Sequence, residues 1–77
     1  MANIYNVRLI ERILKENGML LMSDIVEMTG FCQETIFSCF KDIVAMYKNK
    51  KTKLVRYRFN NKSYYFFGFV YGEWENE

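Results

Sequence analysis

The residues best suited to chemistry in this chain are its lysines and arginines, because most of them lie in one stretch. Between residues 41 and 62 there are eight of them against a single acid, Asp42, so this segment has a net charge of +7. The rest of the chain sums to −5, so the total of +2 conceals two oppositely charged parts. The cations are Lys41, Lys48, Lys50, Lys51, Lys53, Arg56, Arg58 and Lys62. Such clustering is typical of a surface that binds a polyanion.

Groups for catalysis or metal binding are scarce. The chain has no histidine, and Cys32 and Cys39 do not form a CxxC pair, which argues against zinc sites and histidine general bases. On a helix, seven residues place their α-carbons about 10 Å apart, too far for a disulfide, so we expect reduced thiols. Helix caps and solvated faces account for the carboxylates Asp24, Glu27, Glu34 and Asp42. We therefore expect no enzymatic activity, no metal or other cofactor and no small-molecule substrate.

Length and composition predict one domain over residues 1–77, with the acidic residues 73–77 frayed. An aromatic content of 18% lets a short chain build a core from few side chains. No apolar run approaches the roughly 20 residues that span a bilayer, and the first residues lack a signal-peptide core. We expect a cytoplasmic protein without a membrane segment, and the small size without proline or histidine suits a viral or mobile-element protein.

The elements that must position these groups are predicted from apolar spacing. Ile4, Val7, Ile10, Ile13 and Leu14 recur at helical steps, which predicts a helix over 4–16 that ends at Asn17-Gly18. Residues 19–22 form either a short strand or a linker.

Two further helices follow. Ser23 is the expected N-cap of a second helix that ends before Gly30. After a turn of three or four residues, a third helix begins at Cys32 or Gln33 and runs to 47 or 49. Its apolar face consists of Ile36, Phe40, Ile43 and Tyr47.

Residues 53–59 and 62–69 are predicted to pair as a hairpin through a two-residue Asn60-Asn61 turn. This register pairs Arg56 with Tyr65 and Arg58 with Ser63, and we interpret that face as basic. Stacking of the hairpin aromatics on a single strand is an alternative, but a chain this short needs rings for its core. The face assigned to the core holds Val55, Tyr57, Tyr64 and Phe66.

Residues 24–43, DIVEMTGFCQETIFSCFKDI, resemble the general helix-turn-helix pattern almost position by position. Gly30 corresponds to the turn and Phe31 to the apolar residue that fixes the two helices together. The cap and the inner positions are filled by Ser23, Ile25, Val26, Met28, Ile36, Phe40 and Ile43. With the hairpin, the resemblance implies an α+β winged helix-turn-helix domain of three helices and a two-stranded wing.

The resemblance also implies sequence-specific binding of double-stranded DNA, as in a transcriptional regulator. The helix 33–47 would enter the major groove and the wing 53–66 would follow the backbone or minor groove. The implied DNA-binding residues on the helix are Gln33, Glu34, Thr35, Ser38 and Lys41. Those of the connector and wing are Lys50, Lys51, Lys53, Arg56, Arg58 and Lys62.

Two further expectations concern partners. Many small proteins of this type read two half-sites as homodimers, and the dimer surface would be helix 4–16 or the aromatic segment with Phe69, Val70, Tyr71 and Trp74. Phe37, on the flank of the third helix, is expected to pack against another element or a second subunit. The alternative function is a winged-helix module that docks on a polymerase, nuclease or other nucleic-acid machine.

Overall fold

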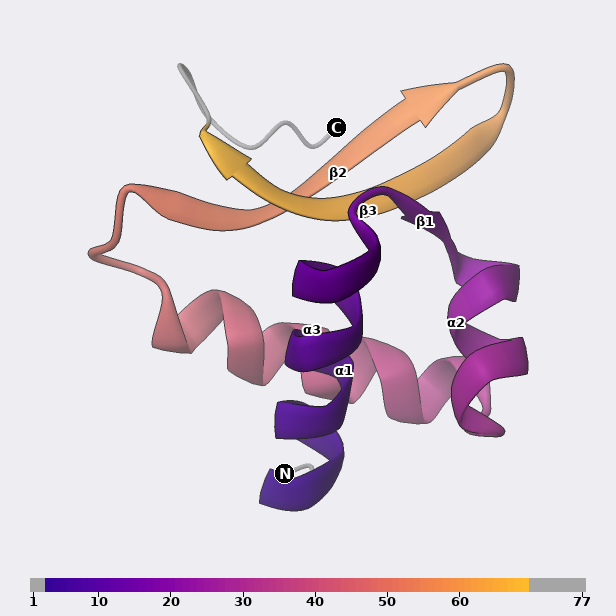
Figure 1. Ribbon diagram of the computed structural model, residues 1–77, viewed down its shortest axis with the longest axis horizontal. Coiled ribbons are helices and arrows are strands. Elements are labelled where there is room, and N and C mark those ends of the chain that lie inside the picture. The colour runs from indigo at the N-terminus through magenta and orange to yellow at the C-terminus, as the bar shows by residue number, and fades with distance from the viewer. Residues whose placement is uncertain (1–2, 70–77) are drawn as a thin grey trace.

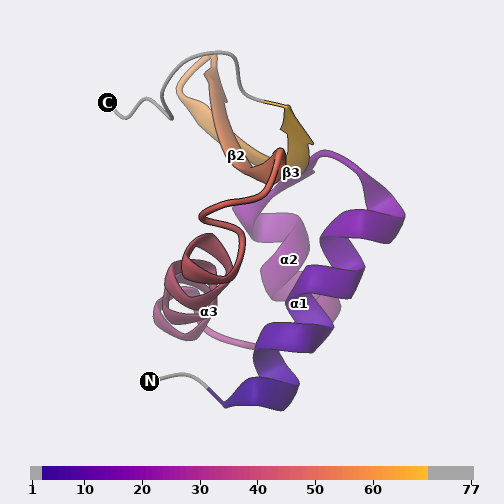
Figure 2. The same ribbon diagram turned by 90° about the vertical axis from the view of Figure 1, so that its left-hand side faces the viewer.

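The computed structural model describes residues 3–69, which form three helices and one three-stranded antiparallel sheet. The helices are α1 (Ile4–Asn17), α2 (Met22–Thr29) and α3 (Gln33–Met46), and the strands are β1 (Leu20–Leu21), β2 (Thr52–Phe59) and β3 (Lys62–Phe69). Figures 1 and 2 show the helices on one side of the sheet, whose strand order is β1-β3-β2. The expected α+β class is confirmed. Residues 20–21 pair with β3, so the strand alternative for 19–22 is the correct one.

The helix ends follow local backbone chemistry. Gly18 (φ 75°) and Gly30 (φ 77°) end α1 and α2 with positive φ angles, which glycine adopts at little steric cost. The expected N-cap at Ser23 is wrong: the N-cap is Leu21, two residues earlier, and its backbone N–H donates to the Asp24 carboxylate at 3.0 Å. α3 begins at Gln33, with Cys32 as its N-cap. Within the described residues, no helix is both long and apolar enough to cross a bilayer.

One hydrophobic core joins all three helices to the hairpin. On α3, Ile36 and Ile43 are fully buried, and the Phe40 ring packs on Tyr65 of β3 with ring centroids 4.7 Å apart. The remaining core side chains are Val7, Ile10 and Leu14 of α1, Ile25 of α2, Cys39 of α3 and Leu54 of β2. Two residues expected on inner faces, Ile4 and Met28, are instead 55% and 49% exposed.

The hairpin has the predicted register, but its two faces are exchanged. Asn60 and Asn61 both have positive φ angles, and Arg56 lies opposite Tyr65, as expected from a two-residue turn. Leu54 and Tyr65 are buried, however, so the face that carries Arg56 is the one that packs on the helices. The interpretation of the other face as core was wrong. Apolar rings occur on both faces, and the helices cover only one of them.

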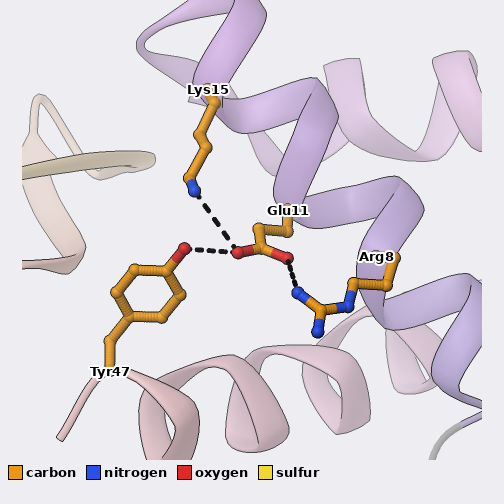
Figure 3. Close-up of polar contacts among 4 residues, drawn as sticks. All are labelled: Arg8, Glu11, Lys15 and Tyr47. Atoms are coloured by element: carbon orange, nitrogen blue, oxygen red, sulfur yellow. Dashed lines mark hydrogen bonds and ion pairs between the residues drawn. The ribbon is translucent and has the colours of Figure 1, made fainter.

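A buried carboxylate joins α1 to the end of α3. Glu11 is 7% exposed and receives a hydrogen bond from the Tyr47 hydroxyl (Figure 3). Its oxygens also lie 3.1 Å from the Arg8 guanidinium and 3.4 Å from the Lys15 amine. The Tyr47 ring packs on Phe67 of β3, with centroids 4.9 Å apart. This cluster therefore holds α1, the C-terminal end of α3 and the hairpin together.

The Tyr47 hydroxyl contributes measurably to stability. Tyr47→Phe removes one donor to a buried carboxylate while it keeps the ring, and we expect a loss of about 1.5–3 kcal/mol in the free energy of unfolding. Urea denaturation followed by circular dichroism measures it. Tyr5→Phe is the matched control, because Tyr5 is 80% exposed on α1. Equal stability of Tyr47→Phe and the control would contradict the prediction.

Glu11 makes stability depend on pH. Burial by itself raises the pKa of Glu11, but hydrogen bonds from Tyr47, Arg8 and Lys15 outweigh it and hold the pKa below the ordinary value of 4.5. The ionised carboxylate therefore stabilises the fold above pH 4.5, and this contribution is lost as the pH falls through the lowered pKa.

We expect the free energy of unfolding of Glu11→Gln to differ from that of the unmodified protein at neutral pH, and the difference to shrink on acidification below pH 4.5. Urea denaturation at a series of pH values measures it. Glu16→Gln, an exposed position of α1, controls for the loss of one negative charge. A difference that is constant across the acid range would refute this account.

Candidate nucleic-acid interface

The outer face of α3 is uncovered. Because Ile36, Cys39, Phe40 and Ile43 turn one side of the helix into the core, the residues between them point away from it. The polar residues predicted for this side are Gln33, Glu34, Ser38 and Lys41, and all four are exposed. Thr35 is half-buried, and its hydroxyl oxygen lies 3.3 Å from the Cys32 sulfur. A partner therefore has access to most of the predicted residues of the helix.

A groove runs between α3 and the hairpin. It has a volume of about 310 Å³, and both Lys41 of α3 and Arg56 of β2 line it. The other lining residues are the apolar Phe37, Phe40, Val44 and Tyr65. Arg56 is half-buried, which fits an aliphatic stem lying on apolar neighbours with the charged head at the surface. Two predicted cations from distant parts of the chain thus meet at one groove.

Two apolar side chains of this surface were not predicted to be part of it. Phe37 is 43% exposed and meets Phe40 edge-on, with ring centroids 6.0 Å apart, and Val44 is 47% exposed. The signal for both was present in the sequence, because residues 37, 41 and 44 are spaced by four and three and share one helix face. The groove is consequently cationic in part and apolar in part.

The lysines of the connector have different roles. Lys50 and Lys51 are exposed between α3 and β2, as expected for residues that attract a polyanion. Lys53 is half-buried, and its amine donates to the carbonyl oxygens of Tyr47 at 3.3 Å and Lys48 at 2.7 Å. A cation at the C-terminal end of a helix neutralises carbonyls that have no partner within the helix. Lys53 therefore fixes the connector to the end of α3.

The predicted cations of the hairpin tip lie on opposite faces. Arg58 pairs with Ser63 and shares the inner face with Arg56, whereas Lys62 pairs with Phe59 and shares the outer face. Both Arg58 and Lys62 are exposed. The structure therefore brings Lys41 and Arg56 together, with Arg58 on the same hairpin face, and separates Lys62 from them.

The charges of the interface are not neutralised within residues 3–69. The ion pairs there join Arg8 and Lys15 to Glu11, and none involves a cation of residues 41–62. Asp42 is half-buried, and Glu34 lies in the first turn of α3, where a carboxylate stabilises the helix dipole. Within the same range, no group of three or more potential metal ligands comes together. The surface of α3 and β2 therefore presents cations to solvent.

The two cysteines differ in environment. Cys32 is exposed beside α3, and hydrogen bonds with the side chain and backbone of Thr35 lower the pKa of its thiol. Cys39 is buried, and burial together with the nearby Asp42 raises the pKa of that thiol. Because the thiolate is the reactive form, the two cysteines should differ strongly in reactivity.

Comparison of the chain with family models, curated proteins and solved structures found no match. Its function is therefore inferred from the geometry and charges of its own residues.

Iodoacetamide at neutral pH should label Cys32 and leave Cys39 unmodified in the folded protein, because only Cys32 combines exposure with a lowered pKa. The labelling rate of Cys32 should rise at a lower pH than that of a free cysteine. Peptide mass spectrometry after timed labelling measures both, and labelling in denaturant provides the reference in which the two sites react alike. Equal labelling of both thiols in the native state would contradict the arrangement of α3.

Proposed function

We propose that this chain is a winged helix-turn-helix protein that binds double-stranded DNA sequence-specifically, as a transcriptional regulator. In this proposal α3 lies in the major groove, where Gln33, Thr35 and Ser38 can bond to base edges. The inner face of the hairpin then follows the DNA backbone or minor groove. Lys41 and Arg56, from the two elements, contact phosphates near the point where α3 and the hairpin meet.

One observation carries the proposal. Lys41 of α3 and Arg56 of β2 line the same groove, and the outer face of α3 beside them is exposed. A helix that reads a groove needs one buried and one uncovered side, with cations placed to reach the flanking phosphates. Residues 33–46 and 52–59 meet these requirements together.

The order of the elements also supports the proposal. Two short helices, α2 and α3, are joined by the three residues 30–32 and followed directly by the β2-β3 hairpin. β1 adds a short third strand beside β3. The helix-turn-helix and wing layout is compatible with this arrangement, in which Phe31 packs partly buried against the core close to the turn.

A docking site for another protein is the second candidate function, and the apolar part of the groove favours it. Phe37 and Val44 expose nearly half of their surface beside Lys41, and such a surface could take an apolar peptide that carries an acid. The carboxylate of Glu34 on the same face of α3 would also disfavour a phosphate there unless it accepts a hydrogen bond from a cytosine amine.

A homodimer is a further part of the proposal. Ile4 and Tyr5 are 55% and 80% exposed at the start of α1, where a second copy could pack. The other expected dimer surface, with Val70, Tyr71 and Trp74, lies outside the described residues, as does the acidic segment 73–77 expected to fray. The Phe69 side chain is likewise not described.

The affinity for mixed-sequence duplex DNA should fall steeply as the salt concentration rises. The single variants Lys41→Met and Arg56→Met should each make this salt dependence shallower. These replacements keep an aliphatic side chain and remove the charge, so each is expected to lower the slope of log affinity against log salt by about 0.9. Fluorescence anisotropy of a labelled duplex over a salt series measures it.

Arg12→Met is the matched control, because Arg12 is an exposed arginine of α1 and should leave the slope unchanged. DNA binding through this groove is refuted if the protein does not bind duplex DNA even at low salt. It is also refuted if the slope of log affinity against log salt changes equally in Lys41→Met, Arg56→Met and Arg12→Met. The first of these results would favour the protein-docking function.

A further inference from the structure

The outer face of the hairpin carries aromatic rings that the core does not use. Tyr57 and Phe59 are 48% and 53% exposed, and their cross-strand partners Tyr64 and Lys62 lie on the same face. The helices lie on the opposite side of the sheet (Figures 1 and 2). The side chains that pack on them from that face include Leu54 and Tyr65. Large exposed apolar surfaces of this kind mark binding sites more often than chance exposure.

The two exposed rings of the outer face do not cover each other. Tyr57 and Phe59 are nearly parallel, at 10°, and their centroids are 6.3 Å apart. Carbon atoms in contact are about 3.5–4.0 Å apart, so the two rings are not in face-to-face contact. A flat aromatic partner can therefore stack on either of them.

The charge of the hairpin selects among possible partners. Residues 43–72 contain no aspartate or glutamate. On the outer face, the exposed Lys62 lies directly opposite Phe59. An aromatic surface with a cation beside it and no acid in its two strands fits a ligand that combines negative charge with flat rings.

A single-stranded nucleic acid has both properties in a reachable form. In a duplex the bases are stacked inside and only their edges reach the grooves, whereas an unpaired strand offers each base as a stacking face along a charged backbone. Exposed aromatic residues also occur at protein–protein interfaces, but lysine is depleted there, so the exposed Lys62 beside the rings fits a phosphate backbone better. The observations therefore favour single-stranded nucleic acid.

We propose that the outer face of the hairpin, formed by Tyr57, Phe59 and Lys62, binds single-stranded nucleic acid by stacking bases on the two rings. Lys62 contacts the phosphate backbone beside them. The duplex groove uses the inner face of the same hairpin through Arg56, so the two surfaces lie back to back. This binding site goes beyond the proposed duplex function and does not rest on it.

The test measures fluorescence anisotropy of a labelled oligothymidine with the full chain and a Tyr57→Leu, Phe59→Leu double variant. Leucine keeps an apolar side chain and removes the ring. We expect affinity for the single strand to fall at least tenfold, because stacking on an aromatic contributes about 1–3 kcal/mol per base. Tyr57→Phe, which retains the ring, should keep the affinity. Tyr5→Leu is the control, since it removes an even more exposed ring from α1, away from the hairpin.

Binding to duplex DNA separates this inference from the proposed function. The Tyr57→Leu, Phe59→Leu variant should bind duplex as the unmodified protein does, whereas Lys41→Met with Arg56→Met should weaken duplex binding more than single-strand binding. If the unmodified protein binds the single strand but not the duplex, the duplex groove is refuted and the aromatic site stands.

Single-strand affinity that is unchanged by the double leucine variant, or lost equally in Tyr57→Phe, overturns the aromatic site. An unchanged affinity in the double leucine variant is also expected if a second copy or the acidic C-terminal residues occupy this face. Circular dichroism of each variant confirms that the comparison is between folded proteins.

Discussion

The burial of one side of α3 is the constraint on which the rest of the structure depends. Ile36 and Ile43 are completely covered, and Phe40 packs on Tyr65, so the helix is fixed to both α1 and the hairpin by the same face. Among the elements of residues 3–69, no second layer covers the other side of this 14-residue helix. Its outer face is therefore exposed because the core is thin, and the same packing that holds the helix determines which residues a partner can reach.

The hairpin, like α3, has one buried side and one exposed side, and its residues alternate between the two. Alternate residues of β2 and β3 lie on opposite faces, so Leu54 and Tyr65 pack on the helices while Tyr57 and Phe59 point away. Arg56 shares the inner face but reaches the groove beside α3. One two-stranded element thus gives the protein two chemically different surfaces: a face toward α3 that includes Arg56, and an aromatic face toward solvent.

Charge is divided between structural and available groups. Glu11 is buried and accepts from Tyr47, Arg8 and Lys15, and Lys53 binds carbonyls at the end of α3. These polar contacts hold α1, α3 and the connector in place, which makes up for the small apolar core. Lys41 and Arg56 form no ion pair within the described residues and remain at the groove. A count of basic residues alone treats Lys53 and Lys41 as equivalent, and the structure shows that they are not.

The sequence by itself determined the three helices and the two hairpin strands, most of their ends to within a residue or two, and the register of the hairpin, but it left β1 open as a strand or a linker. These depend on local signals: helical spacing, Gly18 and Gly30 at positive φ, and an Asn60-Asn61 turn. Tertiary structure alone decided which face of the hairpin is buried. Both faces carry aromatic rings, so the alternation of residues along the strands does not indicate which face packs on the helices. It also decided that Glu11 is buried and that Lys53 caps α3, because both depend on neighbours that are distant along the chain or brought close only by folding. Local backbone preferences act over a few residues, whereas burial is a property of the packed whole.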